Sequence, residues 1–584
     1  MNRPDTTFVR TRRPLDLDTG SDPTSMILLD GTIKQCLEIG RTRLLAAGLV
    51  FAMAFLVVGL RLVDVSLLTD GNEPRLAAAP RSNALETIRA DIVDRNGVVL
   101  ATTLPTASLY ANPRQVLDPE AVAARLSAAL PELPGAELAA KLATEKSFVW
   151  LKRKLSPRQQ HEVNRLGIPG LYFQHEPDRV YPHGALTAHV IGFAGMDNRG
   201  LSGIEQAFEE RLRGATRPLA LSLDLRVQHV LTEELAAAMA TFRAIGAAGL
   251  VLDAESGEVV AMASLPSFDP ARPGEADDDA RFNRASLGVY EMGSVFKIFT
   301  TAMALDQGAV GLQDGYDVSQ PIRVASYTIR DFKPKNRWLS VPEIFIYSSN
   351  IGSVHMAMDS GTPAQKAFLG NLGLTRAAQI EVPEVGQPMV PSPWREINTM
   401  TISYGHGLAV SPLQMVSAVA AVDHGGELVP ATLLKRGGGE RVVVRRVLSA
   451  RTSRDMRWLM RLAVQNGTGR LADAPGYLVG GKTGTADKLR GRRYARSARI
   501  ASFIGAFPMD RPRYVIFAMI DEPKGIESTH GYATGGWVAA PVVRRVIERM
   551  GPLLGIQPKA LDEEEGADRH LVPVNLKGTV FAAN

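Results

Sequence analysis

Residues 290–305 read YEMGSVFKIFTTAMAL, and this stretch is the starting point for interpreting the rest of the chain. Ser294 follows a glycine and opens an apolar helix, so its hydroxyl lies at a helix N-terminus and Lys297, three residues on, shares its face. A serine hydroxyl is unreactive until a base removes its proton, and a lysine is a base only if desolvation or a nearby cation lowers its pKa. Taken alone, the stretch is better explained as a helix cap with an exposed lysine one turn later.

Two further short motifs lie downstream, each once in the chain. The SSN motif (348–350) follows the apolar VPEIFIY, which delivers polar groups at the edge of a hydrophobic segment. By itself it is equally well a helix-capping turn. The KTG motif (482–484) lies in YLVGGKTGTAD, which predicts a β-strand edge whose glycines let another backbone approach. An S-x-x-K or S-x-N match arises about once by chance in a chain of this length, whereas the ordered combination of all three motifs is much more specific.

A phosphate-binding loop is the competing interpretation of the glycine-rich segment. GYLVGGKT (476–483) matches the bare G-x-x-x-x-G-K-[ST] pattern. However, Tyr477, Leu478 and Val479 are apolar strand formers where a phosphate site needs a flexible loop, and no βαβ unit surrounds the match. We therefore favour the strand.

Strand and helix patterns on both sides of the motifs predict the fold class. Two strands are expected within 247–266 and two more at 498–508 and 513–523, with a closing helix from Pro541. Strands at both ends with helices between them indicate an α+β arrangement, an antiparallel sheet covered by helices. Further upstream, IRADIVDRNGVVLATT (88–103) predicts a β-hairpin that turns at Asn-Gly, within a smaller mixed domain.

The three motifs together resemble those of the penicillin-binding proteins and serine β-lactamases. Residues 89–101 are also similar to the opening of the class B penicillin-binding proteins, with Ala90 where glycine is usual, and residues 179–212 to their linker between pedestal and catalytic domain. Met292 stands where their Y-E-P-G-S-x-x-K motif has proline, which changes the entry turn and no catalytic group.

The resemblance implies a role for each motif residue. Ser294 is the nucleophile, Lys297 its base and Lys482 the cation that lowers the pKa of that base. Ser348 relays a proton to the leaving amine, and Asn350 binds the substrate backbone. The expected catalytic residues are Ser294, Lys297, Ser348, Asn350 and Lys482, and the expected substrate-binding residues are Thr483, Gly484 and Thr485. The backbone N–H groups of Ser294 and Thr485 are expected to form the oxyanion hole. No metal or organic cofactor is implied.

The function that follows is that of a peptidoglycan D,D-transpeptidase, which cross-links stem peptides of lipid-II-derived glycan strands through an acyl-enzyme on Ser294 and is inhibited by β-lactams. The short N-terminal module favours a division-specific, septal member over an elongation-specific one. The glycosyltransferase domain of class A relatives has no counterpart, and the E-x-x-L-N motif of one β-lactamase class is absent. A catalytically silent penicillin-binding scaffold or sensor is the alternative from another functional class.

Residues 44–60 form an uncharged apolar run bracketed by arginines, which is long enough to span a bilayer. A cleaved signal peptide is disfavoured because a tail of 43 residues precedes the run. The charge bias predicts a single-pass inner-membrane protein with a cytoplasmic N-terminus and a periplasmic catalytic domain. The resemblance implies partners in the membrane, a polytopic SEDS-family glycosyltransferase and other division proteins.

The predicted organisation follows from these patterns. It comprises a cytoplasmic tail (1–43), a transmembrane anchor (44–60), a linker (61–85), an N-terminal pedestal domain of the dimerisation type (86–219), a penicillin-binding transpeptidase domain (220–550) and a C-terminal tail (551–584).

Composition excludes other classes. Lys and Arg total 66 against 61 Asp and Glu, a net charge of +5, and both signs are interspersed, so no nucleic-acid partner is expected. The single cysteine, Cys36, precedes the apolar run and leaves no disulfide or cysteine metal site for the folded part. No H-E-x-x-H motif supports a zinc hydrolase.

Overall fold

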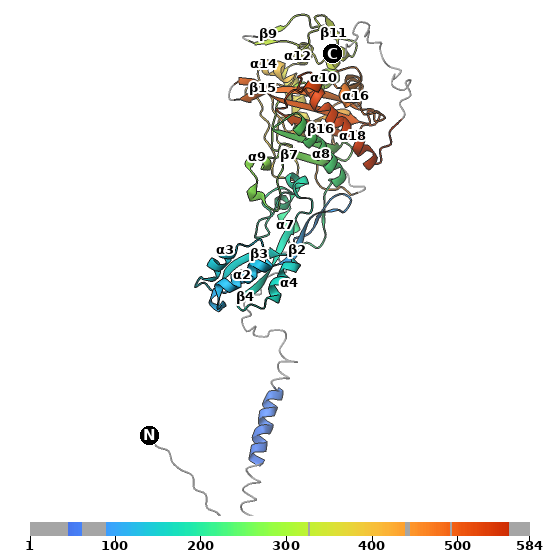
Figure 1. Cartoon of the computed structure of the whole chain (residues 1–584). Helices are drawn as coiled ribbons and strands as arrows, with labels where there is room; N and C mark the ends of the chain where they lie inside the picture. Colours follow the sequence, from blue (N-terminus) through green and yellow to red (C-terminus); the bar gives the residue numbers. More distant parts are fainter. Residues whose placement is uncertain (1–44, 61–88, 325–326, 438–443, 491–492, 560–584) are drawn as a thin grey trace, which may run out of the picture. The chain divides into compact units, whose positions relative to one another are not determined.

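The computed structural model describes residues 45–60 and 89–559, apart from 325–326, 438–443 and 491–492. It divides into two compact units, Met1–Ser82 and Asn83–Asn584 (Figure 1). In the first unit, a helix covers residues 45–60 and nearly all of its side chains are exposed. The predicted anchor begins at Leu44, which lies outside the described residues, as do the predicted tail (1–43) and linker (61–85). Among the described residues, no helix combines the length and the apolar composition that crossing a membrane requires.

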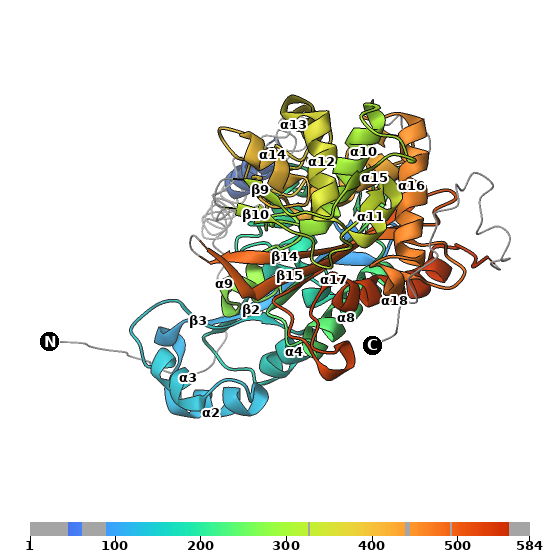
Figure 2. The ribbon, with the colours of Figure 1, turned by 90° about the horizontal axis from the view of Figure 1, so that it is seen from above.

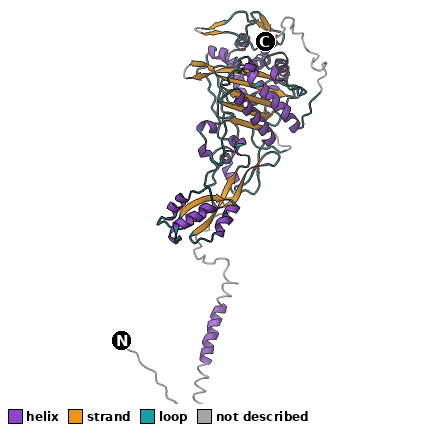
Figure 3. Cartoon of the chain, in the orientation of Figure 1, coloured by secondary structure: helices purple, strands orange, loops and turns teal. Residues whose placement is uncertain are grey.

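A five-stranded sheet with helices packed on it forms the N-terminal part of the second unit (Figure 3). Strand β2 pairs antiparallel with β1, β3 and β4, and β1 pairs parallel with β5. The elements are β1 (Ile92–Val93), β2 (Val99–Ala111), α2 (Pro119–Ala129), α3 (Gly135–Leu142), β3 (Val149–Leu155), α4 (Pro157–Arg165), β4 (Leu171–Val180) and β5 (Leu219–Ala220). Apolar side chains from β2, β3 and the three helices form its core, including Leu109, Leu126, Leu138, Leu151 and Val163.

The predicted hairpin between β1 and β2 is confirmed. The side chain of Asp94 accepts hydrogen bonds from the backbone N–H of Asn96 (2.7 Å) and of Val98 (2.9 Å). Gly97 completes the turn at φ +87°, a value that glycine adopts without strain. The Asn-Gly pair therefore forms the predicted turn, and the preceding aspartate stabilises it.

A buried group of three charges, which we call the ion triad, consists of Arg89, Arg179 and Glu205. Arg89 Nε donates to Glu205 Oε2 at 2.9 Å, and Arg179 Nε donates to Glu205 Oε1 at 2.6 Å. The three side chains are at most 3% exposed. Arg89 also pairs with the partly exposed Glu209 at 2.5 Å, so two arginines meet two carboxylates. The triad joins the start of the described pedestal to its last helices, α6 (Gly203–Ala207) and α7 (Glu209–Leu212).

The remainder of the second unit is built on a second five-stranded sheet, in the order β14-β15-β16-β6-β7 and antiparallel throughout. Its strands are β6 (Gly246–Asp253), β7 (Val259–Leu265), β14 (Gly480–Arg490), β15 (Arg493–Phe507) and β16 (Tyr514–Asp521). The helices α8 (Leu225–Thr241) and α18 (Ala540–Leu553) cover one face, while α10 (Lys297–Asp306), α15 (Pro412–Asp423) and α16 (Ala450–Gln465) cover the other (Figure 2). This confirms the predicted α+β class.

The central strands are apolar on both faces because both faces are covered. Along β6, Ala247 and Val251 belong to the core beside α8 and α18, whereas Leu250 and Leu252 belong to the core beside α15. Period-two alternation therefore does not show in the sequence of such a strand.

Shorter elements complete the second unit. They are α5 (Ala188–Ile191), α9 (Asp278–Arg281), β8 (Gly315–Asp317), β9 (Ile322–Val324), β10 (Tyr327–Ile329), β11 (Trp338–Ser340), α11 (Val341–Tyr347), α12 (Asn350–Ser360), α13 (Thr362–Asn371), α14 (Glu396–Ile402), β12 (Glu427–Leu428), β13 (Arg445–Arg446) and α17 (Gly535–Val538).

One local prediction is wrong. Tyr477, Leu478 and Val479 were expected to continue the strand of the KTG motif, but β14 begins at Gly480 and the three residues form the turn before it. Gly476 has φ +83° and Leu478 has φ +46°, so the backbone reverses here. Tyr477 and Val479 are apolar because they fill the core beneath the sheet. The KT pair lies in a strand rather than at a helix start, which agrees with the rejection of a phosphate loop.

Candidate active site

Ser294 lies in a tight turn against the edge of the sheet. The segment Gly293–Phe296 is a 3-10 helix that leads into α10. The first turn of the predicted helix is therefore wound more tightly than an α-helix. Gly293 has φ +56°, and a Cβ there would lie 2.5 Å from the carbonyl oxygen of Thr485 on β14. Only glycine allows this approach, which places the serine turn directly beside the KTG strand.

The amine of Lys297 lies at the centre of a polar group on α10. Its Nζ is 3.1 Å from Ser294 Oγ, 3.0 Å from Ser348 Oγ and 2.8 Å from Asn350 Oδ1, and it donates to the carbonyl oxygen of Ser348 at 2.6 Å. The residue is 1% exposed. Ser294 and the SSN motif, which the sequence predicted to meet Lys297, are therefore both within hydrogen-bonding distance of its amine.

Lys482 reaches the same group from β14. Its Nζ donates to Ser348 Oγ at 3.0 Å, and the residue is completely buried. The Ser348 hydroxyl thus lies between the two lysine amines. Within the sheet, Lys482 pairs with Ile504 of β15, which fixes the position of the strand.

Ser348 lies in the sharp turn between two helices, α11 and α12, and its hydroxyl faces the lysine amines. Helix α11 ends at Tyr347, and Ser348 takes the left-handed conformation, with φ 61°. The next residue, Ser349, caps α12 by accepting a hydrogen bond from Gly352 N at 3.0 Å. The polar motif after an apolar run is therefore both a helix cap and part of the site.

Alternation along β14 separates the KTG residues. A Cβ on Gly484 would lie 2.6 Å from the Met292 carbonyl oxygen, so this face of the strand is in contact with the serine turn. Thr483 and Thr485 belong to the opposite face. Thr483 Oγ1 is 2.8 Å from Thr468 Oγ1, and Thr485 Oγ1 accepts from Gly535 N at 3.1 Å. All eight predicted site residues thus lie on the serine turn, the start of α10, the SSN corner or β14.

Burial without a hydrogen-bonded carboxylate lowers the pKa of both lysines. Burial, reinforced by the positive charge of Lys482, lowers the pKa of Lys297 well below its ordinary value, while Asp331 opposes this shift. Burial also lowers the pKa of Lys482 to about 7. A free amine next to the Ser294 hydroxyl is the state that general-base catalysis requires.

Sequence reasoning missed Asp331, a buried carboxylate behind the SSN corner. It accepts hydrogen bonds from Ser349 Oγ (2.7 Å), Asn350 N (2.6 Å) and Ile351 N (3.0 Å). It therefore holds the N-terminus of α12, where a negative charge is favoured. No pattern links it to residues 18 to 20 positions away, so a single sequence offers no signal for it.

Sequence reasoning also missed Glu291, three residues before the nucleophile. Its carboxylate accepts from Gly407 N (2.8 Å) and Tyr494 Oη (3.0 Å) and lies 3.1 Å from His406 Nδ1. Burial and the Glu291 charge raise the pKa of Tyr494. Glu291 thereby connects the serine turn, the loop after α14 and the β14–β15 hairpin.

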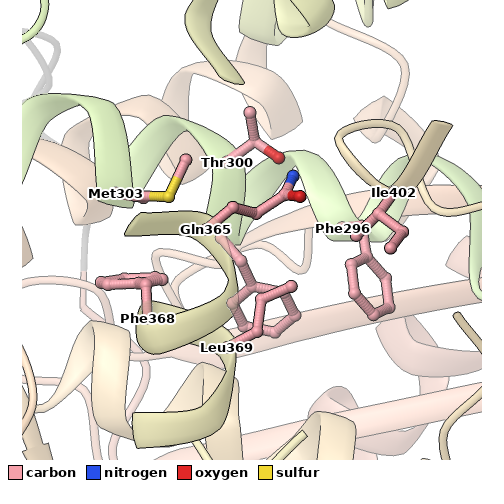
Figure 4. Close-up of a pocket in the computed structure, with 8 residues that line it drawn as sticks. Phe296, Thr300, Met303, Gln365, Phe368, Leu369 and Ile402 are labelled. Carbon is pink, nitrogen blue, oxygen red and sulfur yellow. The ribbon is translucent and has the colours of Figure 1, made fainter. Parts of the chain in front are cut away.

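A small pocket lies behind the nucleophile's helix and not in the site itself (Figure 4). Its lining residues come from the 3-10 turn, α10, α13 and α14, and are mostly apolar: Phe296, Phe299, Thr300, Met303, Gln365, Phe368, Leu369 and Ile402. It is too tight to hold a water molecule. None of the eight predicted site residues lines it, so it is a packing gap behind the catalytic helix.

The described residues contain no group of three or more His, Cys, Asp or Glu side chains arranged to hold a metal ion.

Comparisons with known proteins agree with this geometry. A family model for the penicillin binding protein transpeptidase domain matches residues 247–548, and one for the penicillin-binding protein dimerisation domain matches residues 84–217. The probable peptidoglycan D,D-transpeptidase FtsI of Caulobacter vibrioides is 40% identical over 492 residues, which cover 82% of this chain and 83% of that protein. Peptidoglycan D,D-transpeptidase FtsI of Escherichia coli K12 is 29% identical, over 89% of this chain and 93% of that protein.

Solved structures share the fold. The crystal structure of penicillin binding protein 3 from Mycobacterium tuberculosis in complex with aztreonam matches with a TM-score of 0.65 at 24% identity, over 81% of this chain and 98% of that one. The two family models follow each other in the order in which the two sheets occur here. The chain therefore belongs to the class B penicillin-binding proteins, the peptidoglycan D,D-transpeptidases that carry a dimerisation domain ahead of the transpeptidase domain.

Proposed function

We propose that this protein cross-links peptidoglycan stem peptides during septal wall synthesis through an acyl-enzyme on Ser294. The observation that carries the proposal is the buried Lys297 amine, 3.1 Å from Ser294 Oγ and beside a second buried lysine. With its pKa lowered, Lys297 takes the hydroxyl proton as Oγ attacks the carbonyl carbon of the D-Ala-D-Ala bond.

The leaving amine needs a proton as the peptide bond breaks. Ser348 Oγ lies 3.0 Å from each lysine amine, so it can pass a proton to the departing D-Ala and take one from either lysine. In the second half-reaction the acceptor amine enters where D-Ala left. It gives up its proton along the same path in reverse, attacks the ester carbon and frees Ser294.

The KTG strand supplies the binding surface in this proposal. The backbone N–H groups of Ser294 and Thr485 stabilise the oxyanion, and the hydroxyls of Thr483 and Thr485 bind the terminal carboxylate. Asn350 positions the substrate amide with its side chain, whose Nδ2 now donates to the carbonyl oxygen of Arg330 at 2.8 Å. A β-lactam presents the same carbonyl and carboxylate and acylates Ser294.

The cellular setting is part of the proposal. The apolar run 44–60 and its flanking arginines support a single inner-membrane anchor with the catalytic domain in the periplasm. Similarity to the FtsI proteins of Caulobacter and Escherichia supports a division-specific member. Its proposed partners in the membrane are a polytopic SEDS-family glycosyltransferase and other division proteins. A fluorescent fusion is expected at the septum, and even labelling of the side wall would favour the elongation-specific alternative.

Fluorescent penicillin tests the nucleophile. The wild-type protein should be labelled covalently, and Ser294→Ala should not be labelled although it unfolds at the same temperature. Equal labelling of both proteins would contradict the assignment. If cells that carry only Ser294→Ala divide normally, the silent-scaffold alternative is correct.

A further inference from the structure

A basic segment borders the site on the side of the SSN motif. We call residues 327–338, YTIRDFKPKNRW, the basic lip. It runs from β10 to the start of β11 and carries four cations, Arg330, Lys333, Lys335 and Arg337, against one acid, Asp331. In Figures 1 and 2 the neighbouring strand β9, which pairs with β10, lies beside α12 and α14. The preceding mechanism uses none of its side chains.

The inner side of the lip is fixed to the catalytic corner. Its single acid, Asp331, is buried and holds the N-terminus of α12, as described above. The carbonyl oxygen of Arg330 accepts a hydrogen bond from Asn350 Nδ2. The ammonium of Lys335 lies 4.4 Å from the centre of the Tyr347 ring, at the end of α11. The position of the lip relative to Ser348 is therefore determined by direct contacts.

The outer side of the lip carries positive charge with no compensating acid. Arg330 and Lys333 are exposed, and neither has a carboxylate partner anywhere in the described part of the chain. Glu343 pairs with Arg337, another cation of the lip, at 2.7 Å. Arg330 and Lys333 therefore present exposed positive charges that are not paired with a carboxylate of the described residues.

Lys333 extends toward the other wall of the site. Its Nζ lies 6.0 Å from the ring of Tyr532, which stacks on Trp537 of α17. Helix α17 packs on β14, and Gly535 at its start bonds to Thr485. The lip therefore runs from the SSN corner toward the KTG wall. Its aromatic side chains are also open to solvent, with Phe332 75% and Tyr327 69% exposed.

We propose that the basic lip binds the acceptor stem peptide, with Arg330 and Lys333 pairing with its carboxylates. This deepens and rests on the proposed function. The acceptor amine must enter where the first leaving group departed, next to the Ser348 hydroxyl, and its peptide chain then leads away over the surface joined to Ser349 and Asn350. That surface is the lip. The donor's terminal carboxylate is bound instead by the neutral hydroxyls of Thr483 and Thr485 on β14, so the donor and acceptor carboxylates bind at different places.

A pair of matched acceptors tests this. The full-length protein in detergent is acylated by a neutral D-alanyl thioester donor and then offered a stem-type peptide with free carboxylates, or the same peptide with those carboxylates amidated. Transfer to the amine and hydrolysis are measured separately by chromatography. For R330Q/K333Q, the KM for the acidic acceptor should rise about tenfold with kcat within about twofold, whereas the KM for the amidated acceptor should not change.

Salt and control variants make the result specific. In the wild type, the KM for the acidic acceptor should rise with ionic strength, and in R330Q/K333Q it should be nearly flat. R272Q removes an exposed arginine from the loop before α9, an element that Figure 1 shows well apart from β9 and β11, and should behave as wild type. Unchanged labelling of R330Q/K333Q by fluorescent penicillin shows that its acylation site is intact.

Two results would overturn the lip's role alone. They are equal losses with acidic and amidated acceptors, and no loss with either. Transfer by the wild type to neither acceptor, although Ser294 is acylated, would overturn the transpeptidase function itself and the lip's role with it.

Discussion

Two groups of buried charges lie in the same unit. In one the positive charges are paired with carboxylates, and in the other they are not. In the ion triad, two arginines surround Glu205, and each positive charge meets a carboxylate within 2.9 Å. At the active site, Lys297 and Lys482 are equally buried but meet only hydroxyl, amide and carbonyl oxygens. Compensated charges hold segments together, whereas uncompensated ones shift their pKa and become reactive. The two groups should therefore respond to substitution in opposite ways.

The sharpest test of this comparison is Lys297→Met, which keeps the volume and removes the amine. The second-order rate of acylation by fluorescent penicillin should fall about 10³-fold because the proposed base is removed. The melting temperature should stay the same or rise, since a buried amine without a carboxylate partner is removed. A melting temperature lowered as far as by breaking the ion triad would show that the lysine is structural and would end the comparison.

The reverse result is expected for Glu205→Gln. Two arginines then lack their shared carboxylate, and the free energy of unfolding should fall by about 3–5 kcal/mol, measured by urea denaturation. The surface pair of Glu137 with Lys141 offers a matched control, since Glu137 is 58% exposed and Glu137→Gln should cost less than about 0.5 kcal/mol. Equal effects of the two substitutions would show that burial of the triad contributes nothing.

A third case is a single buried acid, Asp423, at the end of α15. Neither carboxylate oxygen has a hydrogen-bond partner in the described residues, and burial raises its pKa to about 7. The folded state then binds a proton more tightly than the unfolded state, so stability falls as pH rises from the unfolded pKa toward 7 and is level above it. Between pH 5 and pH 7.5 the free energy of unfolding should fall by about 2.5 kcal/mol from this group.

Asp423→Asn is the control for that prediction. It cannot ionise, so its unfolding free energy should lack this slope while other groups keep theirs. Thermal melts at several pH values measure the difference between the two proteins. Parallel curves would mean that Asp423 is paired in solution.

The smallest effect is expected at Asp331. Asp331→Asn keeps the shape but removes the charge that opposes the shift at Lys297, so the pKa of Lys297 falls further. The acid limb of the pH profile of the acylation rate should move to lower pH, because the reaction needs deprotonated Lys297. The maximal rate should fall about tenfold as the charged hydrogen bonds to α12 weaken. A limb that moves to higher pH would contradict the proposed base.

The sequence predicts a chemical group well when its members are close in the chain or belong to an ordered set. Ser294 and Lys297 are one helical turn apart, and the SSN and KTG motifs follow in a fixed order, so their meeting could be predicted. Asp331 and Glu291 could not, because Glu291 contacts Tyr494 across 203 residues and no local pattern marks either partner. Contacts of this kind depend on the packing of whole elements.

Local propensity also misled at one place. Tyr477 and Val479 are strand formers, yet they are buried in a turn. Their apolar character reflects burial, whereas the positive φ at Leu478 turns the backbone away from a strand. The entry to α10 shows a related limit. The sequence correctly predicted a helix after Gly293, but not the 3-10 form of its first turn, which lies against Thr485.

Strand β14 is the first in the sheet order, and among the described strands only β15 pairs with it. One row of its backbone groups is therefore available to any extended chain, including another copy of this protein. In the proposed mechanism a substrate peptide lies along this edge, so the edge stays uncapped and open to edge-to-edge self-association. Crowded or concentrated preparations should aggregate less once a covalently bound β-lactam occupies the edge.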